Sequence, residues 1–234
     1  MVVLVRNKIN NYLINQTFNL NMNKLSQYDD RFISSINDTY TQLIESHEKI
    51  LQNYNFDLSK IEVTEAILIR LKSYYQTQQK IKLFLNKRYL TAGADFFVES
   101  VLFFTKLFLK TSGSNLEVHS ERQSKKEKNS IRPDISIWDG DEVVAIIECK
   151  TQLGWNRDNW ENQFIERELK LKKDFPKAKS FLLVMTGSNW PGFVGNPNLN
   201  SSYFCILKDK WPIDYDDNSQ ILSPIEGLLS QLIN

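Results

Sequence analysis

Two carboxylates and a lysine stand close together in residues 131–151, which read IRPDISIWDGDEVVAIIECKT. Asp134 opens one β-branched run, and Glu148 and Lys150 close the next, with 13 residues between the two acids. Because side chains alternate along a strand, Glu148 and Lys150 share a face and Cys149 points the opposite way. Carboxylate oxygens suit Mg²⁺, and a neighbouring ammonium suits hydrolysis of a phosphodiester. The sequence therefore predicts Asp134 and Glu148 as metal ligands, the Cys149 carbonyl as a third, and Lys150 as the group that handles the nucleophilic water.

These groups meet only if the chain between them forms a hairpin of suitable register. Asp139-Gly140-Asp141 separates the two β-branched runs, which is a strong hairpin signal. A three-residue loop over 140–142 pairs Asp134 with Glu148, and a β-bulge in the hairpin is an alternative that gives the same parity of pairing. A two-residue turn without a bulge would place the carboxylates on opposite faces of the sheet.

The surrounding elements predict an α/β protein. Apolar residues recur at helical spacing in 24–54 and again from Ser59 to Leu85, which predicts a long α-hairpin. An apolar helix over 95–110 follows, and then strands over 116–122, 131–138 and 143–150. A charged amphipathic helix over 159–175 and strands over 179–186 and 203–207 complete the order. We therefore expect a mixed sheet with helices on both faces, in a core of residues 93–234 behind a helical extension of residues 1–92, which would serve DNA binding or dimerisation.

In these motifs and in this element order, residues 95–207 resemble the PD-(D/E)XK nuclease superfamily. The resemblance implies a restriction-endonuclease-like sheet and a catalytic set of Asp134, Glu148 and Lys150. It also implies Mg²⁺ as the cofactor, with Mn²⁺ able to substitute. Many members carry an acidic residue on the helix before the first strand, and Glu99 matches that position as an outer metal ligand. Some carry Gln-x-x-x-Tyr on the following helix, whereas this chain has Gln163 followed by Arg167.

Positive charge is segregated along a chain whose net charge is only +1. No acidic residue occurs between Ala66 and Ala94, and basic residues cluster again between 122 and 132. Segregated positive charge suits a polyanion, although solvated helix and loop surfaces explain it equally well. The candidate DNA contacts are Lys72, Gln76, Lys80, Lys87, Lys125 and Lys126.

The function expected from these features is sequence-specific cleavage of double-stranded DNA, as in type II restriction endonucleases. A homodimer follows as a hypothesis, because cutting both strands generally needs two sites. Another nuclease of the same fold, from a phage, a mobile element or junction repair, is the first alternative; a catalytically silent DNA-binding protein is the second. No run approaches 18 apolar residues, and Cys149 and Cys205 lack the spacing of a disulfide framework, so we expect a cytoplasmic protein without a membrane span.

Overall fold

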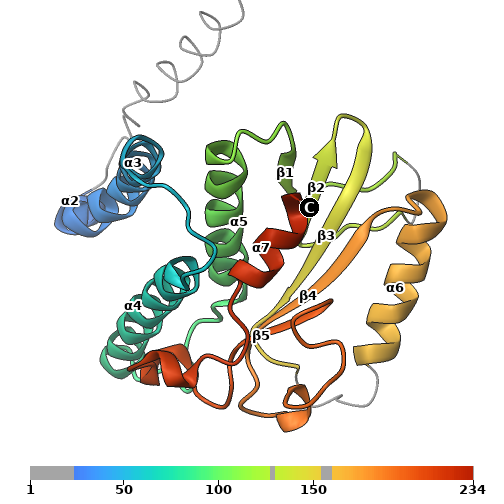
Figure 1. Cartoon of the computed structure of the whole chain (residues 1–234). Coiled ribbons are helices and arrows are strands. Elements are labelled where there is room, and N and C mark those ends of the chain that lie inside the picture. The colour runs from blue at the N-terminus through green and yellow to red at the C-terminus, as the bar shows by residue number, and fades with distance from the viewer. Residues whose placement is uncertain (1–23, 127–129, 154–159, 234) are drawn as a thin grey trace, which may run out of the picture. The chain divides into compact units, whose positions relative to one another are not determined.

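A computed structural model describes residues 24–126, 130–153 and 160–233 of the chain (Figure 1). Its elements, in chain order, are α2 (Lys24–Tyr28), α3 (Asp30–Asn53), α4 (Glu62–Phe84), α5 (Ala94–Thr111), β1 (Glu117–Ser120), β2 (Ile135–Asp139), β3 (Glu142–Lys150), α6 (Trp160–Asp174), β4 (Lys179–Thr186), η1 (Pro191–Phe193), β5 (Tyr203–Leu207), η2 (Pro212–Asp214), η3 (Asn218–Gln220) and α7 (Glu226–Ile233).

The chain divides into two compact units, Met1–Gln52 and Asn53–Asn234. Residues 1–23, which belong to the expected helical extension, lie outside the described part. In the first unit, α3 is amphipathic and buries none of its residues. Helix α4, which the sequence analysis grouped with the extension, belongs to the same unit as the sheet. The reason is that α4 buries Ile67, Leu68 and Leu71 completely, whereas most of the apolar residues of α3 are exposed.

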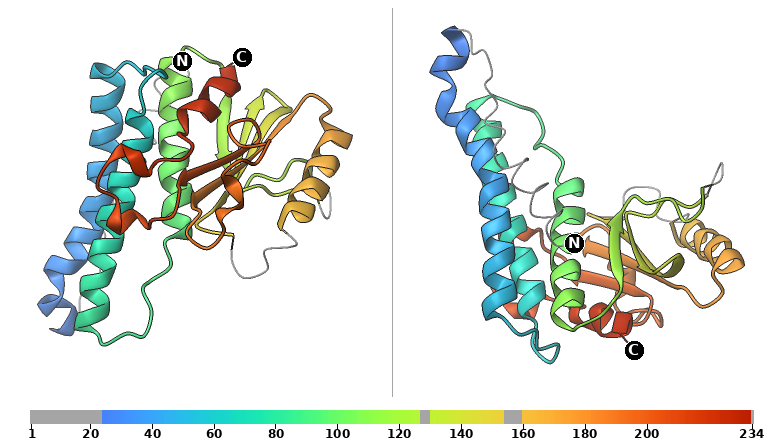
Figure 2. Two further views of the ribbon diagram at one scale, coloured as in Figure 1. Left: turned by 60° about the horizontal axis from the view of Figure 1, so that its bottom comes forward. Right: turned by 90° about the horizontal axis from the view of Figure 1, so that it is seen from above.

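A five-stranded sheet in the order β1-β2-β3-β4-β5 forms the centre of the second unit. The pairs β1–β2 and β2–β3 are antiparallel, and β3–β4 and β4–β5 are parallel. Helices α5 and α7 lie on one face of the sheet and α6 on the other (Figures 1 and 2). The expected mixed sheet with helices on both faces is confirmed. The parallel pairing of β3 with β4 follows from the intervening α6, because a crossover helix returns the chain in the same direction.

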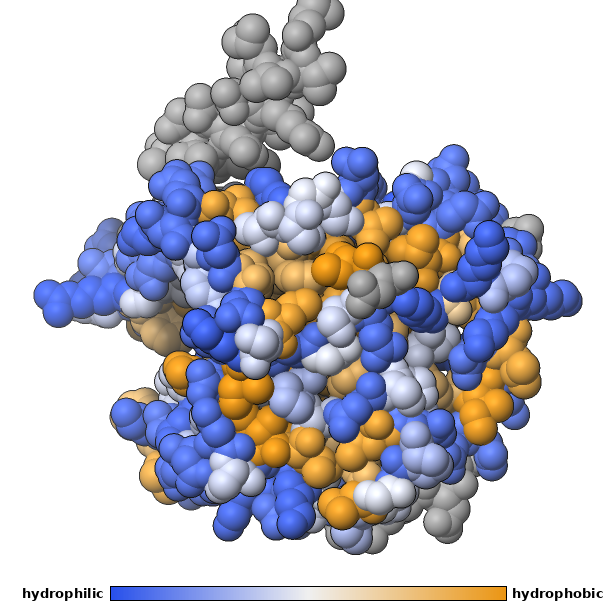
Figure 3. All heavy atoms as spheres, in the orientation of Figure 1, coloured by the Kyte–Doolittle hydropathy of each residue, from blue (hydrophilic) through white to orange (hydrophobic). Residues whose placement is uncertain are grey.

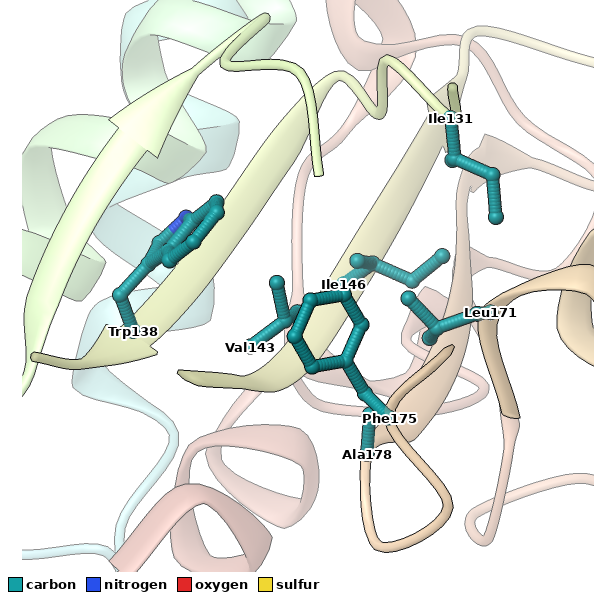
Figure 4. Packing of buried hydrophobic residues seen from close by; sticks show 7 residues of the cluster. All are labelled: Ile131, Trp138, Val143, Ile146, Leu171, Phe175 and Ala178. Atoms are coloured by element: carbon teal, nitrogen blue, oxygen red, sulfur yellow. The ribbon is translucent and has the colours of Figure 1, made fainter. Parts of the chain in front are cut away.

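Packing of α6 against the sheet fixes one face of β3. Trp138, Val143 and Ile146 from the hairpin meet Leu171 and Phe175 in a buried cluster that also contains Ile131 and Ala178 (Figure 4). Residues two apart on a strand share a face, so the inward position of Ile146 predicts the same face for Glu148 and Lys150. The helix thus packs beside the two residues of the motif.

Helices α5 and α7 cover the opposite face of the sheet, where aromatic residues of α5 and of the strands are buried. Phe97 of α5 and Phe181 and Phe204 of β4 and β5 are almost entirely buried. A Cβ atom at Gly227 of α7 would lie 3.3 Å from the Phe204 ring, so α7 packs closely on β5. This face has the composition of a structural core.

Candidate active site at the end of strand β3

The β2–β3 hairpin has the register that brings Asp134 beside Glu148. Asp139 pairs with Glu142 across a two-residue turn, Gly140-Asp141, so the three-residue loop is wrong. Trp138 pairs with Val143, and Ile137 pairs with Ala145. A β-bulge between these two pairs therefore shifts the register by one residue. Ile135 consequently pairs with Ile147, and the next position along places Asp134 opposite Glu148. The β-bulge, which was expected as the alternative to a three-residue loop, is confirmed.

A backbone hydrogen bond fixes the Asp134 carboxylate. The Cys149 N–H donates to Asp134 Oδ2 at 2.8 Å, while the Asp134 carbonyl accepts from the Glu121 N–H on the β1 side. Extended by one more residue, the register sets Cys149 opposite Pro133, which has no N–H to donate to the Cys149 carbonyl. Because the N–H and C=O of a strand residue face the same neighbour, the Cys149 carbonyl points toward the same edge as Asp134.

Lys150 and Arg167 surround the two carboxylates with positive charge. Lys150 Nζ lies 3.7 Å from Asp134 Oδ2 and 3.9 Å from Glu148 Oε2. Arg167 of α6 reaches across to Glu148 Oε2 with Nη1 at 2.5 Å, and its Nη2 donates to the Arg132 carbonyl at 3.1 Å. Two carboxylates and two cations therefore converge at the end of β3.

Burial makes Glu148 an unusual acid. Its side chain is only 3% exposed, whereas Asp134 and Lys150 are 31% and 49% exposed. Loss of hydration raises the pKa of Glu148 from its ordinary value of 4.5 to about 7; Arg167 and Lys150 oppose the rise, and Asp134 adds to it. A perturbed carboxyl next to other charged groups is typical of functional sites.

One oxygen of Glu148 has no partner among the described residues. Glu148 Oε1 is buried and accepts no hydrogen bond from any of them. Glu148 also lines a pocket of about 270 Å³. Its lining consists of Glu148, Lys150, Gln152, Leu153, Gln163, Phe164, Arg167 and Leu182. Native structures rarely leave a buried acceptor unpaired, so this atom is available to a water molecule or a ligand.

Two further predicted residues lie away from this pocket. Glu99 is exposed on α5, on the face of the sheet opposite α6, and does not line the pocket (Figure 1). The Cys149 side chain is 6% exposed, and burial raises the pKa of its thiol well above the usual range. Cys149 thus contributes its backbone to the site and its side chain to the core.

The candidate DNA contacts are spread over two surfaces. On α4, Lys72 is half-buried and its Nζ donates to the Tyr215 carbonyl at 2.5 Å, while Gln76 and Lys80 are exposed. Lys87, after the helix, donates to the Thr91 hydroxyl at 2.8 Å.

In the segment after β1, Lys125 pairs with Asp174 of α6 at 2.7 Å, and Lys126 is exposed. Hydrophobic side chains also reach the surface over α6 (Figure 3). Two of them, Ile165 and Leu169, are 42% and 65% exposed and do not line the pocket.

Sequence reasoning did not assign a role at the site to Arg167. It noted Gln163 and Arg167 only as a departure from a family motif, yet both line the pocket. The signal was present in their spacing, because residues four apart on a helix share a face. Which face of α6 meets β3 was not readable from the spacing alone.

Comparison with protein-family models, with curated proteins and with solved structures gives no significant match. In the described ranges, no helix is long and apolar enough to cross a membrane. The same ranges contain no cluster of three or more His, Cys, Asp or Glu side chains arranged to hold a metal ion. The side-chain donors of the site are therefore the two carboxylates of Asp134 and Glu148.

Proposed function

We propose that the chain is a Mg²⁺-dependent endonuclease that hydrolyses phosphodiester bonds of double-stranded DNA. The observation that carries the proposal is the meeting of Asp134, Glu148 and Lys150 at the end of β3. Glu148 and Lys150 also line a pocket, to which Asp134 does not contribute, and Glu148 Oε1 is buried and unpaired among the described residues. The element order α5-β1-β2-β3-α6-β4, with three antiparallel strands before the crossover helix, supports a restriction-endonuclease-like fold.

The donor set fits a hard divalent cation. Asp134 and Glu148 supply carboxylate oxygens, and the Cys149 carbonyl faces the same edge, so all three are oxygen ligands of the kind that Mg²⁺ and Mn²⁺ accept. When bound, such an ion lowers the pKa of a coordinated water and offsets charge on the phosphate.

The protein's own groups account for the remaining chemistry. The Cys149 N–H holds Asp134 Oδ2 in place, which fixes the geometry before substrate arrives. Lys150 Nζ lies near both carboxylates and is half exposed, so it can reach a water molecule and a phosphate oxygen in the pocket. There it orients the attacking water and stabilises the negative charge that develops on the phosphate.

Duplex DNA is the proposed substrate because exposed basic and amide side chains on α4 and after β1 suit a phosphate backbone. Cutting both strands generally requires two active sites, so we include a homodimer in the proposal.

Digestion of phage DNA with Mg²⁺ tests this function. Discrete bands are expected from the wild-type protein and a complete loss of cutting from Asp134→Asn. Asp139→Asn, a change of the same kind at the exposed far end of β2, serves as the matched control and should cut normally. A smear, or cutting of branched DNA alone, would favour a different nuclease of this class. Absence of any metal-dependent cutting would reject the enzyme in favour of a silent DNA-binding protein.

A further inference from the structure

Arg167 holds one of the two oxygens of Glu148, a residue that the proposed function makes a metal ligand. Its guanidinium divides its donors between Glu148 Oε2 and the Arg132 carbonyl. Glu148 belongs to β3 and Arg132 to the segment before β2, whereas Arg167 belongs to α6. Because one Glu148 oxygen already receives Arg167 and the other has no partner among the described residues, the carboxylate is only half satisfied in this state.

The pocket beside this ion pair has the side chains that bind phosphate. Lys150 and Arg167 are cations, and Gln152 and Gln163 carry amide donors, all on the lining of the same pocket. A guanidinium presents a planar fork that matches two oxygens of a phosphate, and its bonds to an anion are charge-assisted. Among the described residues of the lining, Glu148 is the one acid.

Helix α6 can stay in place while the Arg167 side chain moves. Phe164 and Leu171, on either side of Arg167 along the helix, are buried in the two core clusters of this face. The Arg167 side chain itself is 37% exposed and borders the pocket. A long side chain on an anchored helix needs only a rotamer change to turn from Glu148 to the pocket.

We propose that Arg167 is a phosphate-binding residue that exchanges partners during the catalytic cycle. Without metal it neutralises Glu148; when a divalent cation takes the Glu148 carboxylate, Arg167 moves to a non-bridging oxygen of the substrate phosphate. This inference rests on the proposed function, because it names the residue that holds the substrate in that site. The exchange follows from repulsion, since two cations at the same carboxylate oppose each other in a buried environment, even when each lies on a different oxygen.

The first test measures binding of Mg²⁺ alone by calorimetry, at a pH above the range in which Glu148 titrates. Arg167→Gln should bind Mg²⁺ several-fold more tightly than the wild type, because a competing positive charge has been removed. Lys172→Gln removes the same charge from an exposed position of α6 that does not line the pocket, and it should change Mg²⁺ affinity less than twofold, since surface pairs contribute little.

The second test measures how Arg167 variants bind and cleave duplex DNA. With Ca²⁺ in place of Mg²⁺, Arg167→Gln should weaken duplex binding about tenfold, the loss expected for one charge-assisted hydrogen bond. With Mg²⁺, its single-turnover cleavage rate should fall about 100-fold, as for loss of a donor to a developing anion. Arg167→Lys should recover part of the rate, because a lysine keeps the charge and loses the fork.

The outcomes separate this role from a structural one. If Arg167→Gln binds Mg²⁺ more weakly and loses cleavage in parallel, Arg167 merely supports Glu148 and the exchange is refuted. Unchanged duplex binding and cleavage in that variant would remove Arg167 from the substrate site. The Mg²⁺ and Ca²⁺ measurements need no cutting, so they test Arg167 even if the wild-type protein proves not to be a nuclease.

Discussion

Two buried glutamates on opposite faces of the same sheet differ in how well their oxygens are satisfied. Glu148 and Glu226 are each 3% exposed. Glu226 Oε1 accepts from the Val63 and Thr64 amides at 2.8 and 3.0 Å, and its Oε2 accepts from the Thr64 hydroxyl at 2.5 Å. Glu148 has two cations near one oxygen and no described residue bonded to the other.

The difference teaches how to distinguish an acid that stabilises the fold from one of equal burial that is available to a ligand. Glu226 of α7 caps the first turn of α4, where no side chain of the helix's own N-cap residue does so, and a negative charge is stabilised by free amides there. Glu148 borders a pocket instead, and its Oε1 receives no such amide from the described part of the chain. A carboxylate whose hydrogen bonds are all made stabilises the fold, whereas one left incomplete beside a pocket is available to a ligand.

The largest expected effect separates the two acids by activity. Glu148→Gln and Lys150→Ala should each lower Mg²⁺-dependent cleavage by about 1,000-fold or more, because in the proposed mechanism they remove a metal ligand and the group that orients water. Glu226→Gln should leave the rate per folded molecule within about twofold, since its carboxylate acts on α4 alone. Single-turnover cleavage, with circular dichroism to confirm folding, measures this contrast. Wild-type rates in Lys150→Ala would invalidate the proposed mechanism.

The free energy of unfolding should fall more when Glu226 is replaced than when Glu148 is replaced, which is the reverse of the order expected for activity. Glu226→Ala should lower the free energy of unfolding by about 3 to 5 kcal/mol, because two buried amides and the Thr64 hydroxyl lose their acceptor. Glu148→Gln should cost less than about 1 kcal/mol at neutral pH, since it relieves the burial of a charge. Urea unfolding of both variants measures the difference. A smaller loss for Glu226→Ala than for Glu148→Gln would overturn the comparison.

The pH dependence of stability should identify Glu148. Its pKa is raised in the folded state to about 7, so between pH 4.5 and 7 the folded protein binds more protons than the unfolded chain. Stability from this group is therefore present at acidic pH and is lost as pH rises through that window, by up to about 3 kcal/mol. Relative to Glu148→Gln, which cannot titrate, the wild type should lose stability from pH 5 to pH 8. An equal pH profile for the two proteins would show that burial does not perturb this carboxyl.

The smallest expected effect tests whether the basic residues on and after α4 contact DNA. Replacing Lys72, Lys80 and Lys87 by Gln should flatten the salt dependence of duplex binding by about two to three logarithmic units, at about 0.9 for each phosphate that the protein no longer neutralises. Cleavage at saturating enzyme should stay near normal, because these residues do not line the pocket. Lys72 already donates to the Tyr215 carbonyl, so we expect Lys72 to contribute the least of the three lysines to the salt dependence. An unchanged slope would make α4 purely structural and transfer the DNA contact to Lys125 and Lys126.

The sequence by itself determined the positions of the strands, the helix that crosses between β3 and β4, and three residues of the candidate site, Asp134, Glu148 and Lys150, because alternation and turn residues are local properties of the chain. Glu148 and Lys150 had to share a face, whatever the tertiary structure. Their meeting with Asp134 was undecided, since a two-residue turn alone would have separated them and one bulged residue reversed the outcome.

Only the tertiary structure decided which helix packs beside the site and which glutamate keeps an oxygen without a hydrogen-bond partner among the described residues. Arg167 reaches Glu148 because α6 packs its Leu171 and Phe175 against the hairpin, a choice of face that spacing within the helix does not specify. Glu226 and Thr64 lie 162 positions apart, so no local pattern links them. Burial and hydrogen-bond partners are properties of the packed chain, and for that reason two glutamates of equal burial differ in how completely their oxygens are paired.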